Sequence, residues 1–329
     1  MIGIRSVKHF ALAGITSAVL ATGLAACSSS STPKTTPTTT TSTPTRTPVQ
    51  SPAAKALAAA AQKTSAAPSA DLSLNFNIVQ PSGSASSGSA GGASGSGSPV
   101  VIAGALEGPY DITATKGNFA IRVTSGSAAS LACQLLFGGS STTCALTPVY
   151  LVDGIAYIHV PSTGVLSTEA NGKPYLKVSL SALLGLFASG LSSTFSNPAV
   201  LFDLLETPAL HATEIGPSTI GTTPTTEYKA TVNIADAVSA GGPAASLYKG
   251  IESAAAGTKT ETTTVFVGSD GNLARLSLAI HDLPAGPAGL WPQGSTLNLS
   301  LTLTNFGAPV VVTPPPASEY YYLSHVPNL

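Results

Sequence analysis

Strict alternation between apolar and polar side chains constrains the fold of this chain more than any other feature. In the first alternating stretch, Ser73, Asn75 and Asn77 separate apolar residues, so every second side chain is apolar. The apolar positions of four such stretches are Leu72, Leu74, Phe76 and Ile78; Phe119, Ile121 and Val123; Leu276, Leu278 and Ile280; and Leu297, Leu299, Leu301 and Leu303. Successive side chains of a strand point to opposite faces, so this period of two predicts half-buried antiparallel strands with one apolar face.

Two Asp-Gly pairs indicate how such strands connect. Asp153-Gly154 and Asp270-Gly271 each stand between two apolar-rich runs. The flanking runs are residues 150–152 and 155–160 for the first pair, and 262–267 and 273–280 for the second. Asp-Gly between alternating runs is the strongest short-range hairpin signal. We therefore expect a meandering antiparallel sheet.

Helical signals are found at the start and in the middle of the folded part. Ser51-Pro52 provides a capping hydroxyl and a proline at the first helical position, which predicts a helix over residues 53–63. A second helix is predicted from an apolar stripe at helical spacing, formed by Leu180, Leu183, Leu184, Phe187 and Leu191.

Two further helices are predicted after this stripe. One starts at Asn197-Pro198, stops at Thr207-Pro208, and carries Val200, Leu201, Leu204 and Leu205. The other covers residues 243–256 and ends at Gly257. Strands combined with helices gathered in one region predict an α+β fold: a single curved antiparallel sheet, or half-open barrel, with helices covering its concave apolar face.

Residues 1–26 have the features of a lipoprotein signal peptide. Arg5 and Lys8 give a positive start, and residues 10–24 form an apolar stretch too short to span a bilayer. The following Leu24-Ala25-Ala26-Cys27 resembles the bacterial lipobox, in which the cysteine sulfur receives a diacylglycerol and the chain is cut before the cysteine. The alternative is an ordinary secretory signal with an incidental cysteine. We expect lipidation of Cys27 to anchor the protein at the cell membrane, facing the extracytoplasmic space.

Two low-complexity segments accompany the predicted domain. Residues 28–50 consist mainly of Ser, Thr and Pro, and residues 82–98 contain only Gly, Ser and Ala. Such compositions cannot bury enough apolar surface to offset the entropy lost on ordering. We expect residues 27–50 to be a tether, residues 51–329 to form the domain, and residues 82–98 to be a disordered loop within it.

Charge and motif content exclude several function classes. Lys and Arg number 14 and Asp and Glu number 15, so only 9% of residues are charged and no basic block is present. This composition lacks the electrostatic footprint of nucleic-acid binding. The chain has no sequence typical of phosphate-binding loops, dinucleotide sites, serine hydrolases or zinc proteases. No enzymatic activity, cofactor or metal site is expected. Asp203 and Glu206 lie one helical turn apart, but the solvated face of a helix explains them better than a pair of catalytic carboxylates.

Cys133 and Cys144 form an even pair once Cys27 is assigned to lipid. In an oxidising compartment such a pair predicts a disulfide, with Gly138-Gly139-Ser140 as the turn between the two cysteines. A zinc site is the weaker interpretation because two thiols alone do not complete one.

Four features together resemble those of the actinobacterial lipoproteins of the LppX/LprG type, which have a LolA-like half-barrel fold. They are the lipobox at Cys27, the strand-turn-strand of residues 149–160, the segment Gly172-Lys173-Pro174-Tyr175-Leu176-Lys177-Val178, and residues 306–317 with their Pro314-Pro315-Pro316 run. The resemblance covers residues 53–319. It implies a cavity between the sheet and the helices that carries acyl chains of lipids or glycolipids.

The expected function is therefore lipid or glycolipid binding, and lipid transport, by a monomeric membrane-anchored lipoprotein. The candidates for lining the cavity are Leu72, Leu74, Phe76, Ile78, Phe119, Ile121, Leu183, Leu184, Phe187, Leu191, Leu201, Leu204, Leu276, Leu278, Leu299 and Leu301. The alternative is a non-carrier lipoprotein with a sealed core that acts through protein or cell-wall contacts. Besides the lipid and the membrane, the expected partner is an envelope transporter or a cell-wall component.

Two sets of polar residues remain open to two interpretations each. Arg122, Lys173, Lys177 and Arg275 are either a polar rim that meets a lipid headgroup or scattered solubilising charges. Tyr320, Tyr321 and Tyr322 form either an exposed adhesive patch or an edge strand laid on the barrel.

Overall fold

The structure, a computed structural model, describes residues 50–81, 100–130, 133–134, 141, 143–179, 200–242, 244–254, 259–286 and 291–323. All of these residues belong to one compact unit, Pro48–Leu329. The lipobox, the loop of residues 82–98, the apolar stripe of residues 180–191 and the turn at Gly138-Gly139-Ser140 lie outside the described residues.

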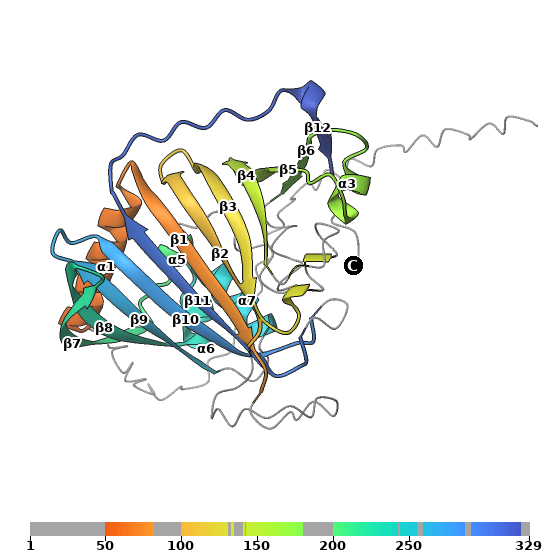
Figure 1. The fold of residues 1–329 in the computed structure, drawn as a ribbon. Helices are drawn as coiled ribbons and strands as arrows, with labels where there is room; N and C mark the ends of the chain where they lie inside the picture. The colour runs from red at the N-terminus through yellow and green to blue at the C-terminus, as the bar shows by residue number, and fades with distance from the viewer. Residues whose placement is uncertain are drawn as a thin grey trace, which may run out of the picture. The chain divides into compact units, whose positions relative to one another are not determined.

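One open sheet of twelve strands organises the unit (Figure 1). In chain order the strands are β1 (Ser69–Val79), β2 (Val100–Asp111), β3 (Lys116–Ser125), β4 (Cys144–Val152), β5 (Ile155–His159), β6 (Tyr175–Ser179), β7 (Leu210–Ile220), β8 (Thr223–Asn233), β9 (Thr260–Gly268), β10 (Leu273–Leu283), β11 (Ser295–Thr304) and β12 (Tyr320–Tyr322). Their order across the sheet is β12-β6-β5-β4-β3-β2-β1-β11-β10-β9-β8-β7. The pairing is antiparallel throughout, except that β12 runs parallel to β6.

The register of the central strands brings the alternating positions onto common faces. In the β1–β11 pair, Leu72 lies opposite Leu303 and Ile78 opposite Leu297, while Asn77 lies opposite Asn298. Leucines of β10 continue the apolar row beside β11. The sheet therefore has an apolar face and a polar face, as the alternation predicts.

Both predicted hairpins are present. Asp153 and Gly154 connect β4 to β5 with φ of 52° and 73°, the left-handed values that a type I′ turn requires. At the second hairpin Gly271 has a φ of 78° between β9 and β10.

The helices of the described residues are α1 (Pro52–Ser65), α3 (Val165–Glu169), α5 (Val200–Asp203), α6 (Ile234–Ala240), α7 (Ala245–Ala254) and the 3-10 turn η2 (Ala317–Glu319). Of these helices, α1, α6 and α7 pack on strands β7–β10, whereas α3 and η2 stand next to the strands of the opposite edge in the chain. The main helix–sheet contacts join α1 to β7, β9 and β10, α6 to β8, and α7 to β10. Figure 1 shows α5, α6 and α7 on one side of the sheet. The predicted α+β class and open half-barrel are confirmed.

Local signals account for α1. The Ala54 N–H donates to the Ser51 hydroxyl oxygen at 3.1 Å, and Pro52 occupies the first helical position. The helix buries Leu57 and Ala61 against the apolar face, and its two lysines, Lys55 and Lys63, are exposed. The cap and the proline define the start of the helix, as predicted.

The middle of the chain differs from the prediction in three helices: α5 is shorter than expected, and neither α3 nor α6 was predicted. The helix expected to run to Thr207 ends as α5 at Asp203, and tight turns at Leu205 and Glu206 follow it. The unpredicted α6 is capped by Asn233, whose side-chain oxygen accepts from the Asp236 N–H.

Candidate functional site

Helices bury the apolar face over strands β7–β10. Leu201, Phe202 and Leu204 around α5, and Tyr248 and Ile251 of α7, are buried in the same hydrophobic core as the sheet leucines. The Tyr248 hydroxyl donates to the Leu204 carbonyl oxygen at 3.1 Å, which ties α7 to the end of α5. This half of the face is a packed core.

The centre of the apolar face is less completely covered. Leu74, Leu106, Ile121 and Leu299 are only partly buried, as is Phe76 between them. Register places Leu106 between Leu74 and Ile121, and it places Phe76 opposite Leu299. These five residues form one continuous patch over β11, β1, β2 and β3, which we call the central apolar patch.

Gly104 explains how the ring of Phe76 fits into this patch. A Cβ at Gly104 would collide with Cζ and Cε1 of Phe76 and with the Arg122 carbonyl oxygen. The ring therefore lies across β2 where a side chain would otherwise stand. Only glycine permits this close approach of a ring to the backbone.

The structure divides the predicted cavity residues into three groups. Eight are 1–3% exposed: Leu72, Ile78, Phe119, Leu201, Leu204, Leu276, Leu278 and Leu301. Four belong to the central apolar patch: Leu74, Phe76, Ile121 and Leu299. Leu183, Leu184, Phe187 and Leu191 lie outside the described residues. Sequence reasoning missed Leu106, because the stretch around it, Ala103 to Gly108, lacks strict alternation.

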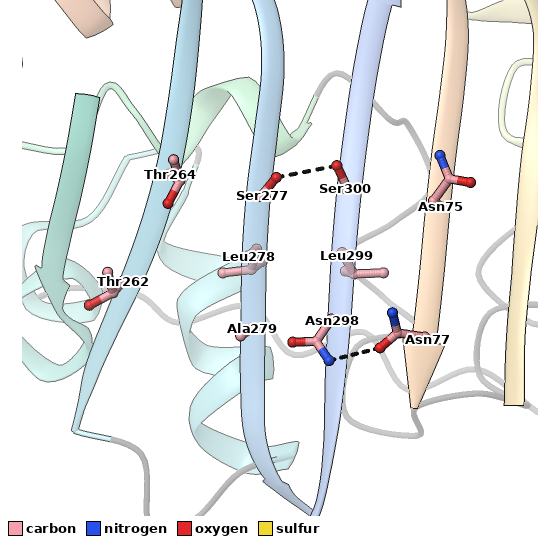
Figure 2. Close-up of a pocket in the computed structure, with 10 residues that line it drawn as sticks. All are labelled: Asn75, Asn77, Thr262, Thr264, Ser277, Leu278, Ala279, Asn298, Leu299 and Ser300. Carbon is pink, nitrogen blue, oxygen red and sulfur yellow. Dashed lines mark hydrogen bonds between the residues drawn. The ribbon is translucent and has the colours of Figure 1, made fainter. Parts of the chain in front are cut away.

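A groove lies on the opposite, polar face of the sheet (Figure 2). Its volume is about 370 Å³, and its lining comprises Asn75, Asn77, Thr262, Thr264, Ser277, Leu278, Ala279, Asn298, Leu299 and Ser300. Asn298 donates to the Asn77 side-chain oxygen at 2.8 Å, and the hydroxyl oxygens of Ser277 and Ser300 lie 3.2 Å apart. The lining offers hydrogen-bond donors and acceptors but no charge, so its chemistry does not match that of an acyl-chain pocket.

The cations predicted as a headgroup rim do not surround the central apolar patch. Arg122 lies 3.8 Å from the Glu107 carboxylate, and Arg275 donates to the Thr302 hydroxyl oxygen at 3.1 Å, both on the polar face. Lys177 lies among tyrosine rings near the β12 edge. Lys173 donates to the Ser318 carbonyl oxygen at 2.7 Å.

Two carboxyl groups have unusual environments. Burial raises the pKa of Glu261 to about 7, although backbone hydrogen bonds from Thr262 and Ala279 favour the ionised form. Burial, together with the charge of Glu206, raises the pKa of Asp203, and both side chains are half-buried. Among the described residues, no group of three His, Cys, Asp or Glu side chains is arranged to hold a metal ion.

The predicted disulfide between Cys133 and Cys144 is present. Cys144 begins β4 opposite Val123 of β3, and Cys133 is buried in the core. The bond therefore fixes the start of β4 to the segment before it.

Comparisons with known proteins concern the fold. No family model and no curated protein matches the chain. Among solved structures, the lipoprotein LppX of Mycobacterium tuberculosis aligns over 79% of this chain and 97% of its own, with 12% identity and a TM-score of 0.41. LprF from Mycobacterium bovis aligns over 81% of this chain and 98% of its own, with 14% identity and a TM-score of 0.41.

A LolA superfamily protein from Nitrosomonas europaea aligns over 77% of this chain and 94% of its own, with 11% identity and a TM-score of 0.25. The chain is similar to LppX-type and LolA-type proteins. Of the helices in the described part of the chain, none is long and apolar enough to cross a bilayer.

Proposed function

We propose that this protein is a membrane-anchored envelope lipoprotein that binds acyl chains of a lipid or glycolipid against the central apolar patch. The observation that carries the proposal is the contrast in burial across one face. The leucines under the helices are almost fully buried, whereas Leu74, Leu106, Ile121 and Leu299 of four adjacent strands are only partly so. Exposed apolar surface that is continuous across strands is typical of a ligand site.

The size of the patch suits an acyl chain. Four adjacent strands span about 14 Å at the usual spacing of about 4.8 Å. Each methylene removed from water contributes about 0.8 kcal/mol, so ten methylenes provide about 8 kcal/mol before the costs of association. The five side chains of the patch are all apolar, so they favour the hydrocarbon part of a lipid over its headgroup.

The second candidate is a lipoprotein with a sealed core that acts through protein or cell-wall contacts. It is favoured by the near-complete burial of eight predicted cavity residues and by the position of the groove on the polar face. Under this alternative, side chains of the chain itself complete the packing over the central apolar patch.

A paired substitution separates the two functions. If acyl chains occupy the patch, Leu106→Phe places a ring in ligand space, so lipid recovered by extraction and mass spectrometry should fall while the Tm of the delipidated protein changes little. Leu276→Phe is the matched control in the packed core, where overpacking costs about 1–3 kcal/mol and should lower the Tm. An equal fall in Tm for both variants, with no lipid extracted from the unmutated protein, would favour the sealed core and reject the carrier.

A further inference from the structure

Five tyrosines gather on the polar face at one edge of the sheet. β12 is the edge strand, and its parallel register places Tyr320 beside Tyr175 and Tyr322 beside Lys177. Across β6 and β5, Lys177 lies opposite Tyr157, which in turn lies opposite Tyr150 of β4. Residues 145 positions apart in the sequence thus meet on one surface, which we call the tyrosine edge.

The rings pack around the ammonium group of Lys177. Its Nζ lies 5.0 Å from the ring centroid of Tyr320, 5.6 Å from that of Tyr157 and 5.8 Å from that of Tyr322. The Tyr157 and Tyr320 rings meet edge to face with centroids 5.4 Å apart, and the Tyr150 and Tyr175 rings lie 6.2 Å apart and tilted by 41°. The cluster therefore has a defined packing rather than being a loose tail.

The outermost rings remain open to solvent. Tyr322 is 56% exposed on the polar face, and Tyr321 is 40% exposed on the opposite face beside buried Leu176. A surface that meets this edge head-on would contact rings from both faces of the sheet. Lys173 supplies a second cation next to the edge through its bond to Ser318, and Glu319 supplies one carboxylate.

This chemistry matches the headgroup region of a bilayer. Tyrosine combines an apolar ring with a polar hydroxyl, and it is enriched where hydrocarbon meets water. Lysines at such a surface are attracted to anionic headgroups. The Tyr150 and Tyr175 rings are inclined by 41° and the Tyr157 and Tyr320 rings by 70°, and Lys177 lies over three of the rings, so these rings do not form one flat platform of the kind that stacks on a polysaccharide.

We propose that the tyrosine edge is a bilayer-contact surface that seats β12 and β6 in the headgroup layer of an anionic phospholipid membrane. The surface lies apart from the central apolar patch, so it is independent of whether the protein carries lipid. It would give the domain a fixed orientation on the membrane, with β12 toward the lipid.

Vesicle binding tests the proposal with the acyl anchor removed. The mature chain, residues 27–329 with Cys27→Ala, is sedimented with vesicles of phosphatidylcholine containing one-third phosphatidylglycerol. The double substitution Tyr321→Ser and Tyr322→Ser should lower the partition coefficient at least tenfold, and Lys177→Gln should remove the preference for anionic over neutral vesicles. Ile215→Ser is the matched control, because Ile215 is 59% exposed on β7 at the opposite edge of the sheet.

A gain of signal locates the contact without relying on loss of binding. Lipids brominated on their acyl chains should quench the tryptophan fluorescence of the Tyr322→Trp variant but not the added fluorescence of the Ile215→Trp variant. The buried native Trp291 contributes the same background fluorescence in both variants. The proposal is overturned by absence of vesicle binding, by equal loss of binding in the Ile215→Ser control, or by quenching at residue 215 rather than 322. Binding of purified cell-wall polysaccharide that depends on Tyr322, without vesicle binding, would equally reject it in favour of a glycan surface.

Discussion

Glu261 is a carboxyl group on the apolar face of β9, where it lies opposite Val232. It is 3% exposed, and its Oε2 atom has no hydrogen-bond partner within the described residues. Burial removes hydration from the ionised carboxylate, and the backbone hydrogen bonds from Thr262 and Ala279 offset only part of that loss, which is why its pKa rises to about 7. The residue therefore favours its neutral form in the folded protein.

The sign of the resulting pH dependence follows from proton binding. Between the ordinary pKa of 4.5 and about 7, the folded protein keeps a proton that the unfolded chain releases. Stability should therefore be greatest below the lower value and fall as pH rises through this window, by a total on the order of 3 kcal/mol. Urea unfolding at pH values from 5 to 8 measures this fall in the free energy of unfolding. The fall should be present in the unmutated protein and absent in Glu261→Gln. Glu252→Gln, at an exposed position of α7, serves as the control and should leave the pH profile unchanged. A profile that Glu261→Gln leaves unaltered would show that Glu261 ionises normally.

At the scale of single elements, the Cys133–Cys144 disulfide closes a short loop ahead of β4. In the loop-entropy account, closing a loop of about this length stabilises the folded state by about 2–4 kcal/mol. Denaturant unfolding of Cys133→Ala/Cys144→Ala should show a loss of this size, and reductant should bring the unmutated protein to the same stability. Thiol counting on the denatured, unreduced chain with Cys27→Ala should find no free thiol; two reactive thiols would contradict the bond.

Elements encoded by local chemistry were predictable from the sequence, whereas elements that depend on distant partners were not. The Ser51 cap, the two Asp-Gly turns and the alternating rows of β1, β10 and β11 each depend on neighbouring residues. By contrast, β7 and β8 are rich in Thr and have no regular apolar row, and β12 is a strand only because β6 provides an edge for it. Asn233 was an available cap signal for α6, but the helix is too short for an apolar stripe to stand out.

The candidate site follows the same rule. Alternation identified the apolar side chains of β1, β3, β10 and β11, but their degree of burial depends on where helices lie over the sheet. Leu278 and Leu299 are neighbours in the register, yet Leu278 lies in the packed half and Leu299 in the central apolar patch. Which apolar residues are available to a ligand is therefore a property of the assembled layers rather than of the sequence pattern.

At the scale of the whole molecule, anchoring and membrane contact are separate proposals. Acylation at Cys27 would fix the chain to the bilayer through residues 28–50, because two or more acyl chains hold a protein at a membrane whereas one chain binds only marginally. The tyrosine edge would determine only how the domain is oriented there. The two contributions should therefore separate when the cysteine is removed.

Cys27→Ala in cells should abolish labelling by a fatty-acid probe and move the protein from the membrane fraction to the soluble fraction. Ser28→Ala is the matched control and should preserve both, because it leaves the acylated residue in place. Any residual membrane association of Cys27→Ala should disappear when Tyr321→Ser and Tyr322→Ser are added, since only the headgroup contact would then remain. Labelling that persists in Cys27→Ala would reject the lipobox assignment and favour an ordinary secretory signal. Loss of labelling without release, unaffected by the tyrosine substitutions, would instead require a second membrane attachment elsewhere in the chain.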